Sequence, residues 1–288
     1  MDEQEFLNSQ KRQREHYNLS LDDENNLLGQ FPDKKYFEFL YHCWLNEYHD
    51  EPDLLWKEWS PWQVWSYPIH DLIRYKTMLL DNSDLIKGAR IADIGSHLGI
   101  GVLFSLHMGA ELCVGIEPIE AKNKLASFVC RQAGFNNFEF ITGELKQEQI
   151  FEKINDFDTL ILGGLMDMIP DHYRLIDNIS KTQIKNIIIE VGEHEQHCRS
   201  DIPNIVWRHF EKDKIGHGPY NPAVNNAIHG FPNLSFLKML MGEFGYEFQK
   251  QDFFDVIKTD TGKPRLRSVS VFKNCRKGRL TPTGRMLI

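Results

Sequence analysis

The clearest indication of the fold comes from residues 91–101, which read Ile-Ala-Asp-Ile-Gly-Ser-His-Leu-Gly-Ile-Gly. An apolar run ends at an acid, Asp93, and a glycine-rich loop leads into the apolar helical pattern of residues 99–108. Glycine adopts backbone conformations that other residues avoid, so Gly95 and Gly99 predict a tight turn and a close approach of the backbone to a ligand. The stretch therefore predicts a strand, a ligand-binding loop and a helix.

Short apolar runs and helical patterns alternate along the middle of the chain. Strands are predicted at 90–94, 112–116, 138–142, 159–162 and 186–190, with helices at 99–108, 120–133 and 171–181. Such alternation is typical of βαβ units, which form a parallel sheet with helices on both faces. After a helix at 235–244, strands at 246–257 and 266–272 are joined by a turn. The predicted fold class is α/β, with a mostly parallel sheet that ends in an antiparallel C-terminal hairpin.

Regions of unusual composition flank and interrupt this pattern. An aromatic-rich N-terminal helical extension or lid is predicted over 1–80, ahead of a main domain at 81–274. An insertion at 191–234 breaks the alternation, and long connections in compact domains are often functional. Both regions are expected to cover the ligand. They carry the stripe Trp56, Trp59, Trp62 and Trp65 and the hydrogen-bonding side chains His194, His217, Tyr220, Asn225, Asn226 and His229.

Composition excludes several classes of protein. The 288 residues are 41% hydrophobic and 26% charged, which are globular values and exclude a disordered or collagen-like chain. The longest apolar runs are far too short to span a bilayer, and the N-terminus does not resemble a secretory signal. The five cysteines form no close pairs, which argues against a disulfide framework. We therefore expect a cytoplasmic protein with no membrane partner.

Charge is distributed unevenly along the chain. The net charge is -8, yet residues 258–288 contain nine Lys and Arg and a single acid, Asp260. A basic C-terminal tail at 275–288 on an acidic body can meet a phosphate-bearing partner such as RNA. A solvated terminus is the alternative interpretation.

Two further acids follow the next predicted strands. Glu117 ends the second strand, where a carboxylate can accept hydrogen bonds from both hydroxyls of a ribose. Gly143 and Glu144 follow the third strand, where an acid can lie beside an adenine. Ligands of open α/β sheets bind at the carboxyl ends of the strands, so these acids and Asp93 are expected to face one crevice.

The spacing of the loop separates two kinds of cofactor. Dinucleotide-binding folds use G-x-G-x-x-G and hold a pyrophosphate at the helix N-terminus. Here the order is Gly95-x-x-x-Gly99-x-Gly101, and no Lys or Arg lies between Arg90 and Lys122. An acid pointing into this loop would repel a pyrophosphate and suit a sulfonium. An NAD-dependent oxidoreductase is disfavoured and stays open as an alternative.

Residues 88–192 resemble the class I S-adenosylmethionine-dependent methyltransferases. Asp93, Gly95 and Gly99 match the first motif of that family. Glu117 matches its ribose-binding acid. The resemblance implies a Rossmann-like sheet and S-adenosyl-L-methionine as cofactor. The residues that it places at the cofactor are Asp93, Gly95, Ser96, His97, Gly99, Glu117, Pro118, Gly143, Glu144 and Gly163.

Within that family the chain is similar to two groups. The aromatic entry and residues 231–233 before an apolar helix resemble tRNA wobble-uridine methyltransferase-like proteins. The Asp-Ile-Gly and Ile-Glu-Pro stretches resemble FkbM-type sugar O-methyltransferases. His97 departs from the pattern because many members have a small residue there. This difference is expected to alter how tightly the methionine part of the cofactor is bound. The resemblance defines the cofactor and leaves the acceptor open.

Candidates for the acceptor side follow the fourth and fifth strands. In the resembling family the loop after the fourth strand faces the transferable methyl, which makes Asp167 and His172 candidate catalytic residues. Glu190 and His194 follow as candidate bases. Asp171 is expected to cap the next helix. No metal is expected, because the spacing of His194, His197 and Cys198 matches no common zinc pattern.

The leading interpretation is a methyltransferase that moves a methyl group to an O, N or C nucleophile of a small molecule or RNA. Such an enzyme positions its reactants, excludes water and removes a proton, so a nucleophile triad is not required. A non-catalytic binding protein with a methyltransferase fold is the second alternative, because a fold alone does not establish activity.

Overall fold

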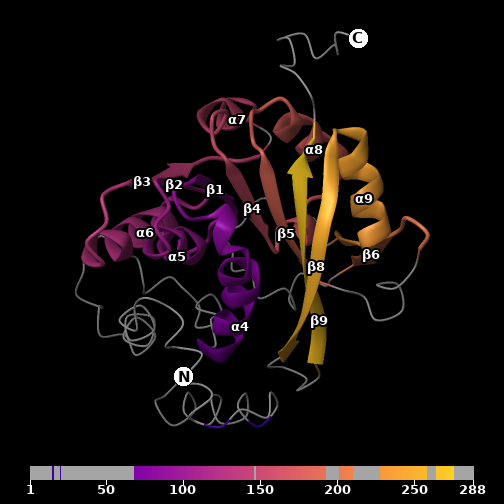
Figure 1. Cartoon of the computed structure of the whole chain (residues 1–288), viewed down its shortest axis with the longest axis horizontal. Helices are drawn as coiled ribbons and strands as arrows, with labels where there is room; N and C mark the ends of the chain where they lie inside the picture. Colours follow the sequence, from indigo (N-terminus) through magenta and orange to yellow (C-terminus); the bar gives the residue numbers. More distant parts are fainter. Residues whose placement is uncertain are drawn as a thin grey trace.

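The computed structural model describes residues 15, 20, 68–145, 147–192, 201–209, 228–257 and 264–275. Its centre is a seven-stranded sheet with the order β3-β2-β1-β4-β5-β9-β8 (Figure 1). The strands are β1 Arg90–Ile94, β2 Leu112–Glu117, β3 Phe138–Thr142, β4 Thr159–Gly163, β5 Asn186–Gly192, β8 Tyr246–Ile257 and β9 Pro264–Asn274. The first five strands run parallel, whereas β9 is antiparallel to β5 and to β8. The predicted α/β sheet with an antiparallel C-terminal hairpin is confirmed.

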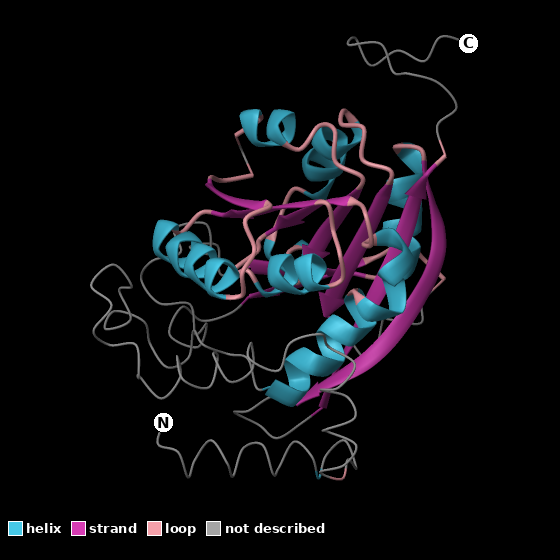
Figure 2. Ribbon diagram, turned by 60° about the vertical axis from the view of Figure 1, so that its left-hand side comes forward, coloured by secondary structure: helices cyan, strands magenta, loops and turns pink. Residues whose placement is uncertain are grey.

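Helices cover both faces of this sheet, as Figure 2 shows. One face carries α4 Pro68–Met78, α5 Ile100–His107 and α6 Glu120–Gln132, and the other carries α7 Gln149–Lys153, α8 His172–Ser180 and α9 Leu234–Glu243. Successive strand residues point to opposite faces. Ile91 accordingly belongs to the core under α4, α5 and α6, while Ala92 belongs to the core under α7, α8 and α9. This alternation fixes the face from which each side chain at the strand ends projects.

Helix α4 belongs to the packed core. Its Tyr75 and Met78, with Leu79 directly after it, join the cluster that contains Ile91. The helix also lies along the long β8–β9 hairpin. The last part of the expected N-terminal extension is therefore packed on the sheet. The tryptophan stripe, most of the insertion and residues 276–288 lie outside the described residues.

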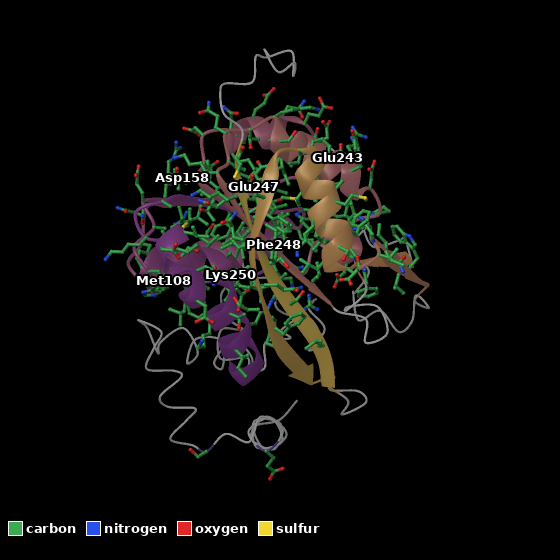
Figure 3. All side chains as sticks on the ribbon, turned by 45° about the vertical axis from the view of Figure 1, so that its right-hand side comes forward. Met108, Asp158, Glu243, Glu247, Phe248 and Lys250 are labelled. Carbon is green, nitrogen blue, oxygen red and sulfur yellow. The ribbon has the colours of Figure 1, made fainter. Side chains whose placement is uncertain are left out.

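The β8–β9 hairpin contains an irregularity in the middle of β8. Between Phe248 and Lys250, both labelled in Figure 3, the pairing with β9 shifts by one residue, which is the pattern of a β-bulge. The Lys250 Nζ donates a hydrogen bond to the Asp81 carbonyl oxygen at 2.8 Å. That contact ties the hairpin to the 3₁₀ helix η3, Leu80–Leu85, which follows α4.

Helix ends agree with the capping residues in the sequence. The Asp171 carboxylate accepts a hydrogen bond from the Arg174 backbone N–H at 3.0 Å, so the expected cap of α8 is confirmed. Asn233 caps α9 by accepting from the Phe236 N–H at 2.8 Å. Gly245, just beyond the end of α9, has a φ of 76°. No helix in the described parts of the chain is long and apolar enough to cross a membrane.

Several short elements were missed by the sequence patterns. They are α7, the 3₁₀ helices η3 and η4 Met166–Met168, and the antiparallel pair β6 Ile205–His209 and β7 Ile228–Pro232 inside the insertion. A helix of five residues is too short to display a 3.6-residue period. The β6–β7 pair joins residues that are distant in sequence, so no local turn signal marks it.

Candidate functional site

The predicted acids meet where the strand order of the sheet reverses. β1 lies between β2 and β4, and this switch point is where ligands of open α/β sheets bind. Asp93, on β1, is in register with Gly115 on β2, two residues before Glu117. Both carboxyl side chains are about 5% exposed. Glu144 is half-buried just after β3. The structure therefore brings Asp93 and Glu117 together, with Glu144 on the next strand end.

The loop after β1 folds as its glycines require. Gly95 and Gly99 both have a φ of 76°, in the left-handed region, and His97 lies between them with a φ of 50°. The backbone N–H groups of Gly95 and Ser96 donate to the Ile116 carbonyl oxygen at 2.8 and 3.1 Å. The Ser96 hydroxyl is buried without a hydrogen-bond partner among the described residues. The loop is thus tied to β2 and offers an unsatisfied hydroxyl.

Two glycines of the motif also serve close packing. A Cβ on Gly99 would lie 2.6 Å from the Ala126 Cβ and 2.7 Å from the Phe140 Cζ. A Cβ on Gly101 would collide with Asp93 Oδ2. Gly99 was expected to let the backbone approach a ligand, and the structure shows that it also packs against α6 and β3. Gly101 is the residue that lets the Asp93 carboxyl lie against α5.

Burial dominates the electrostatics of Asp93. Loss of solvent raises the pKa of Asp93 to about 7, with Arg74 acting to lower it and Glu117 acting to raise it. Arg74 comes from α4, about twenty residues upstream of the motif. A carboxyl in this environment gains from a positively charged partner, because such a partner favours the ionised form.

A buried lysine accompanies Glu117. The Lys122 Nζ lies 3.5 Å from Glu117 Oε1, and the Ile119 backbone N–H donates to the same oxygen at 3.3 Å. Burial lowers the pKa of Lys122, although Glu117 opposes this effect. The sequence patterns did not predict that Lys122 pairs with Glu117. Lys122 lies in the first turn of the helix that follows Glu117, and this position is the signal that could have indicated the pair.

Hydrogen bonds connect the end of β2 to the end of β3. The Asn123 Nδ2 donates to the Glu117 carbonyl oxygen and to the Thr142 Oγ1, each at 2.9 Å. After β3, the Glu144 backbone N–H donates to the Gln147 Oε1 at 3.2 Å. A Cβ on Gly143 would lie 2.7 Å from the Ile150 Cδ1. The third strand end is therefore held closely against α6 and α7.

Glu190 is the centre of a buried ion-pair network. The Arg74 Nε and Nη2 donate to Glu190 Oε2 at 2.9 and 2.6 Å, and the Arg267 Nε donates to Oε1. Burial by itself raises the pKa of Glu190, but Arg267 and Arg74 outweigh it and hold the pKa at about 2. A carboxylate held this way does not take up a proton near neutral pH. The geometry therefore supports an anchoring role for Glu190 and gives no support to its expected role as a base.

Asp167 and His172 are also engaged in internal contacts. The Asp167 carboxylate accepts from the Gly192 N–H at 3.0 and 3.2 Å and lies 3.7 Å from the Arg267 Nη2. The buried His172 Nε2 lies 2.7 Å from the Met166 carbonyl oxygen, to which it donates. Burial lowers the pKa of His172. These contacts hold both residues within the segment that follows β4.

An aromatic contact completes the surroundings of His172. Its ring stacks on Trp207 of β6 with 6.0 Å between centroids, and Phe236 of α9 meets it edge-on at 5.9 Å. The expected insertion residues His194, His217, Tyr220, Asn225 and Asn226 lie outside the described residues, and His229 falls within β7. In the described ranges no three His, Cys, Asp or Glu residues are grouped to hold a metal.

Comparison with known proteins gives similarities in structure alone. No protein-family model matches the sequence, and no curated protein matches it. The N-terminal domain of EvdMO1, crystallised with SAH bound, is 16% identical, with a TM-score of 0.49 over 68% of this chain and 80% of that chain. A putative RNA methyltransferase from Pyrococcus horikoshii is 12% identical, with a TM-score of 0.49 over 72% of this chain and 85% of that chain.

A third structure is similar to the same degree. A putative S-adenosylmethionine dependent methyltransferase from Listeria monocytogenes is 11% identical, with a TM-score of 0.49 over 71% of this chain and 98% of that chain. Identities this low transfer neither an acceptor nor an activity. The strand order of the sheet and its antiparallel last strand pair are observed directly in the structure of this chain and do not depend on the comparisons. By these features the chain has the Rossmann-like fold of the class I methyltransferases.

Proposed function

We propose that this protein is an S-adenosylmethionine-dependent methyltransferase. The observation that carries the proposal is the buried pair Asp93 and Glu117, which lie on adjacent strands at the switch point of the sheet. The loop between Gly95 and Gly99 lies directly beside this pair. Fold and site thus point to the same class of cofactor.

The residues present fit this cofactor. Glu117 would accept hydrogen bonds from the ribose hydroxyls, and Asp93 would face the positively charged methionine part. The Ser96 hydroxyl, which lacks a partner in the described parts, would gain one. The remaining residues proposed to line the cofactor are Gly95, His97, Gly99, Pro118, Gly143, Glu144 and Gly163.

When bound, S-adenosyl-L-methionine supplies an activated methyl group. The chain then has to orient an O, N or C nucleophile, exclude water and accept a proton. Glu190, Asp167 and His172 hold internal contacts that stabilise the acceptor side of the site. His194, which follows β5 in the sequence, is the proposed base, because histidine is the side chain whose ordinary pKa suits proton transfer near neutral pH.

An NAD-dependent oxidoreductase is the second candidate, and the buried acid disfavours it. Asp93 places a carboxyl beside the loop where a dinucleotide fold holds its pyrophosphate, whereas an acid at the position of Glu117 would suit the ribose of either cofactor. The two basic side chains near the acids, Arg74 and Lys122, are paired with Glu190 and Glu117. A pyrophosphate would have to displace one of these ion pairs.

Calorimetry with S-adenosylhomocysteine and with NAD tests the choice of cofactor. We expect binding of the first and none of the second, with Asp93→Ala as the variant that loses binding. Binding of NAD alone would overturn the proposal. Transfer of a labelled methyl group from S-adenosylmethionine into a metabolite pool or an RNA pool then separates an enzyme from a non-catalytic binding protein.

A further inference from the structure

Three residues on neighbouring strands face the same helix layer. They are Asp93 on β1, Gly163 on β4 and Glu190 on β5. Each lies two residues after a core residue beneath α4 and α5, so all three point to that face. These core residues are Ile91, Ile161 and Ile188. On β4, which lies between β1 and β5, Asp93 is in register with Ile161 and Glu190 with Gly163. Glu190 therefore lies two residues further along the sheet than Asp93, and Gly163 leaves the β4 position beside Glu190, diagonally across from Asp93, without a side chain.

Arg74 occupies this space. Its Nη2 lies 3.1 Å from the position of a Cβ on Gly163 and 3.4 Å from that of a Cβ on Gly164. Its two hydrogen bonds to Glu190 Oε2 hold the guanidinium against β5. A side chain at Gly163 would also meet Met78 at 3.0 Å, so glycine makes room for the arginine. The guanidinium therefore lies over the end of β4, bound to Glu190 of β5, and Asp93 lies on the opposite side of β4, two residues earlier in the register of the sheet.

We propose that Arg74 is a positioning residue of the cofactor site. Anchored on Glu190, it sets the charge that Asp93 presents to the cationic methionine part of the cofactor. This inference rests on the proposed function. It also explains why the chain keeps the buried ion pair between Arg74 and Glu190. Removing two charges from water is costly, and a buried ion pair seldom repays that cost in stability alone.

The charges around Asp93 determine whether removal of Arg74 raises or lowers the pKa of Asp93. Glu117 on β2 acts to raise the pKa of Asp93, and Arg74 on α4 acts to lower it. Asp93 in turn contributes to raising the pKa of the buried Cys113 thiol on β2, after the larger effects of burial and Cys130. α5 presents Gly101, which is uncharged. The loop contributes a further titratable group, His97. With Arg74 the pKa of Asp93 is about 7, so removal of Arg74 leaves the carboxyl protonated at neutral pH.

Arg267 provides a matched control. It also binds Glu190, with its Nε on Oε1, and its side chain is buried to a similar extent. Its Nη2 approaches Asp167 and not Asp93. Arg74→Gln and Arg267→Gln therefore each remove one guanidinium from Glu190, but only the first removes the cation that acts on Asp93.

The first experiment measures the titration of Asp93 without cofactor. The free energy of unfolding is recorded from about pH 5 to about pH 9 in each background, with and without Asp93→Asn, so that the general folding cost cancels. We expect a midpoint near pH 7 in the parent and in Arg267→Gln. In Arg74→Gln the midpoint should rise by about one unit or more. Arg74→Lys, which keeps the charge, should stay close to the parent.

Two outcomes would overturn the inference. One is an unchanged midpoint in Arg74→Gln, and the other is an equal rise in Arg267→Gln, which would indicate a structural role of the whole network. Persistence of the midpoint in His97→Gln assigns it to Asp93, whereas its loss would assign the titration to His97 and would also overturn the inference. If Arg74→Gln does not fold, Arg74→Met in the presence of a stabilising osmolyte gives the same comparison.

The second experiment measures affinity for S-adenosylhomocysteine against pH. The parent should lose affinity as the pH falls through about 7, and Arg74→Gln should show the same loss at higher pH. An identical pH profile in both proteins would contradict the inference. Failure of the parent to bind at any pH would instead contradict the proposed function, while the titration of Asp93 would still report on Arg74.

Discussion

Asp93 is a charged group whose burial works against folding. Its pKa is raised from 3.8 to about 7, so the folded state binds the proton more tightly than the unfolded state. Between these two values the folded chain carries more protons, and stability therefore falls as the pH rises through this window. Above about pH 7 the full cost is present. The same carboxyl is the one that a cationic cofactor would stabilise.

Replacement of Asp93 by Asn should therefore stabilise the cofactor-free protein. Above about pH 7 we expect a gain of about 1–3 kcal/mol in the free energy of unfolding, and near pH 4 almost none. Affinity for S-adenosylhomocysteine should be lost in the same variant. Urea unfolding at several pH values and calorimetry measure the two effects.

Asp158 supplies the control of opposite sign. Although burial raises its pKa, hydrogen bonds from Arg90 and Lys185 outweigh this and hold the pKa below its usual value. Ionised Asp158 therefore adds to the free energy of unfolding at pH values above its pKa in the unfolded chain. This stabilisation is lost as the pH falls through the pKa of Asp158 in the folded protein. Asp158→Asn should therefore destabilise the protein at neutral pH. If both variants changed stability in the same direction, the interpretation of Asp93 would be wrong.

Glu117 allows a direct test of the ribose assignment. Glu117→Ala should weaken binding of S-adenosylhomocysteine by about 1.5–3 kcal/mol, the scale for hydrogen bonds to a charged group. Because the variant also removes the carboxylate beside Lys122, the double variant Glu117→Ala with Lys122→Met checks that the loss does not come from an unpaired lysine. Glu120→Ala, whose side chain is exposed, should leave the affinity unchanged. Normal binding by Glu117→Ala, measured by calorimetry, would exclude the assignment.

At the scale of the elements, the loop glycines divide into two kinds. Gly95 has a φ of 76°, and a Cβ there would lie 3.1 Å from Leu165 Cδ1. Gly95→Val should abolish binding, because the left-handed backbone and the space beside the loop both exclude a branched side chain. Undiminished affinity in calorimetry would show that the loop does not approach the ligand.

Gly99 is expected to affect folding as well as binding. Gly99→Ala should cost about 1–3 kcal/mol of stability, because its Cβ would press on Ala126 and Phe140. Gly134→Ala separates packing from backbone strain, since Gly134 has a φ of 87° and nothing within 4 Å of its Cβ position. Thermal unfolding compares the two variants. Equal losses would mean that the backbone conformation alone accounts for the effect.

Local patterns predicted the repeating elements well. The strand bounds 90–94, 138–142 and 246–257 agree with β1, β3 and β8, because apolar runs and their bounding turns are encoded within a few residues. Contacts between distant residues carry no such signal. Arg74 and Glu190 are 116 residues apart, so Glu190 was interpreted as a base and its arginine partners were missed. The site was predictable where it follows strand ends and unpredictable where α4 and β9 contribute side chains.

At the scale of the whole molecule, we expect the basic tail and the insertion to make separable contributions to acceptor choice. The last described residue, Cys275, donates its backbone N–H to the Gly245 carbonyl oxygen at 3.0 Å, so removal of 276–288 leaves β9 intact. We expect this truncation to preserve activity on a small acceptor. If the acceptor is RNA, the truncation should weaken binding and reduce its salt dependence, because four Lys and Arg are removed. Filter binding at several salt concentrations measures this.

The insertion should instead determine turnover. The parts of it that the structure describes form the β6–β7 pair, and Trp207 of β6 stacks on His172 beside the end of β4. That contact anchors the described part of the insertion on the segment after β4, where we propose that the acceptor binds. Alanine substitution of His194, His217, Tyr220 and Asn226 should lower kcat while affinity for S-adenosylhomocysteine stays within a few-fold. Met239→Ala, at an exposed position of α9, should change neither quantity. Full activity in all four variants would separate the insertion from the acceptor, and a parallel loss of cofactor affinity would place these residues at the Asp93 and Glu117 crevice instead.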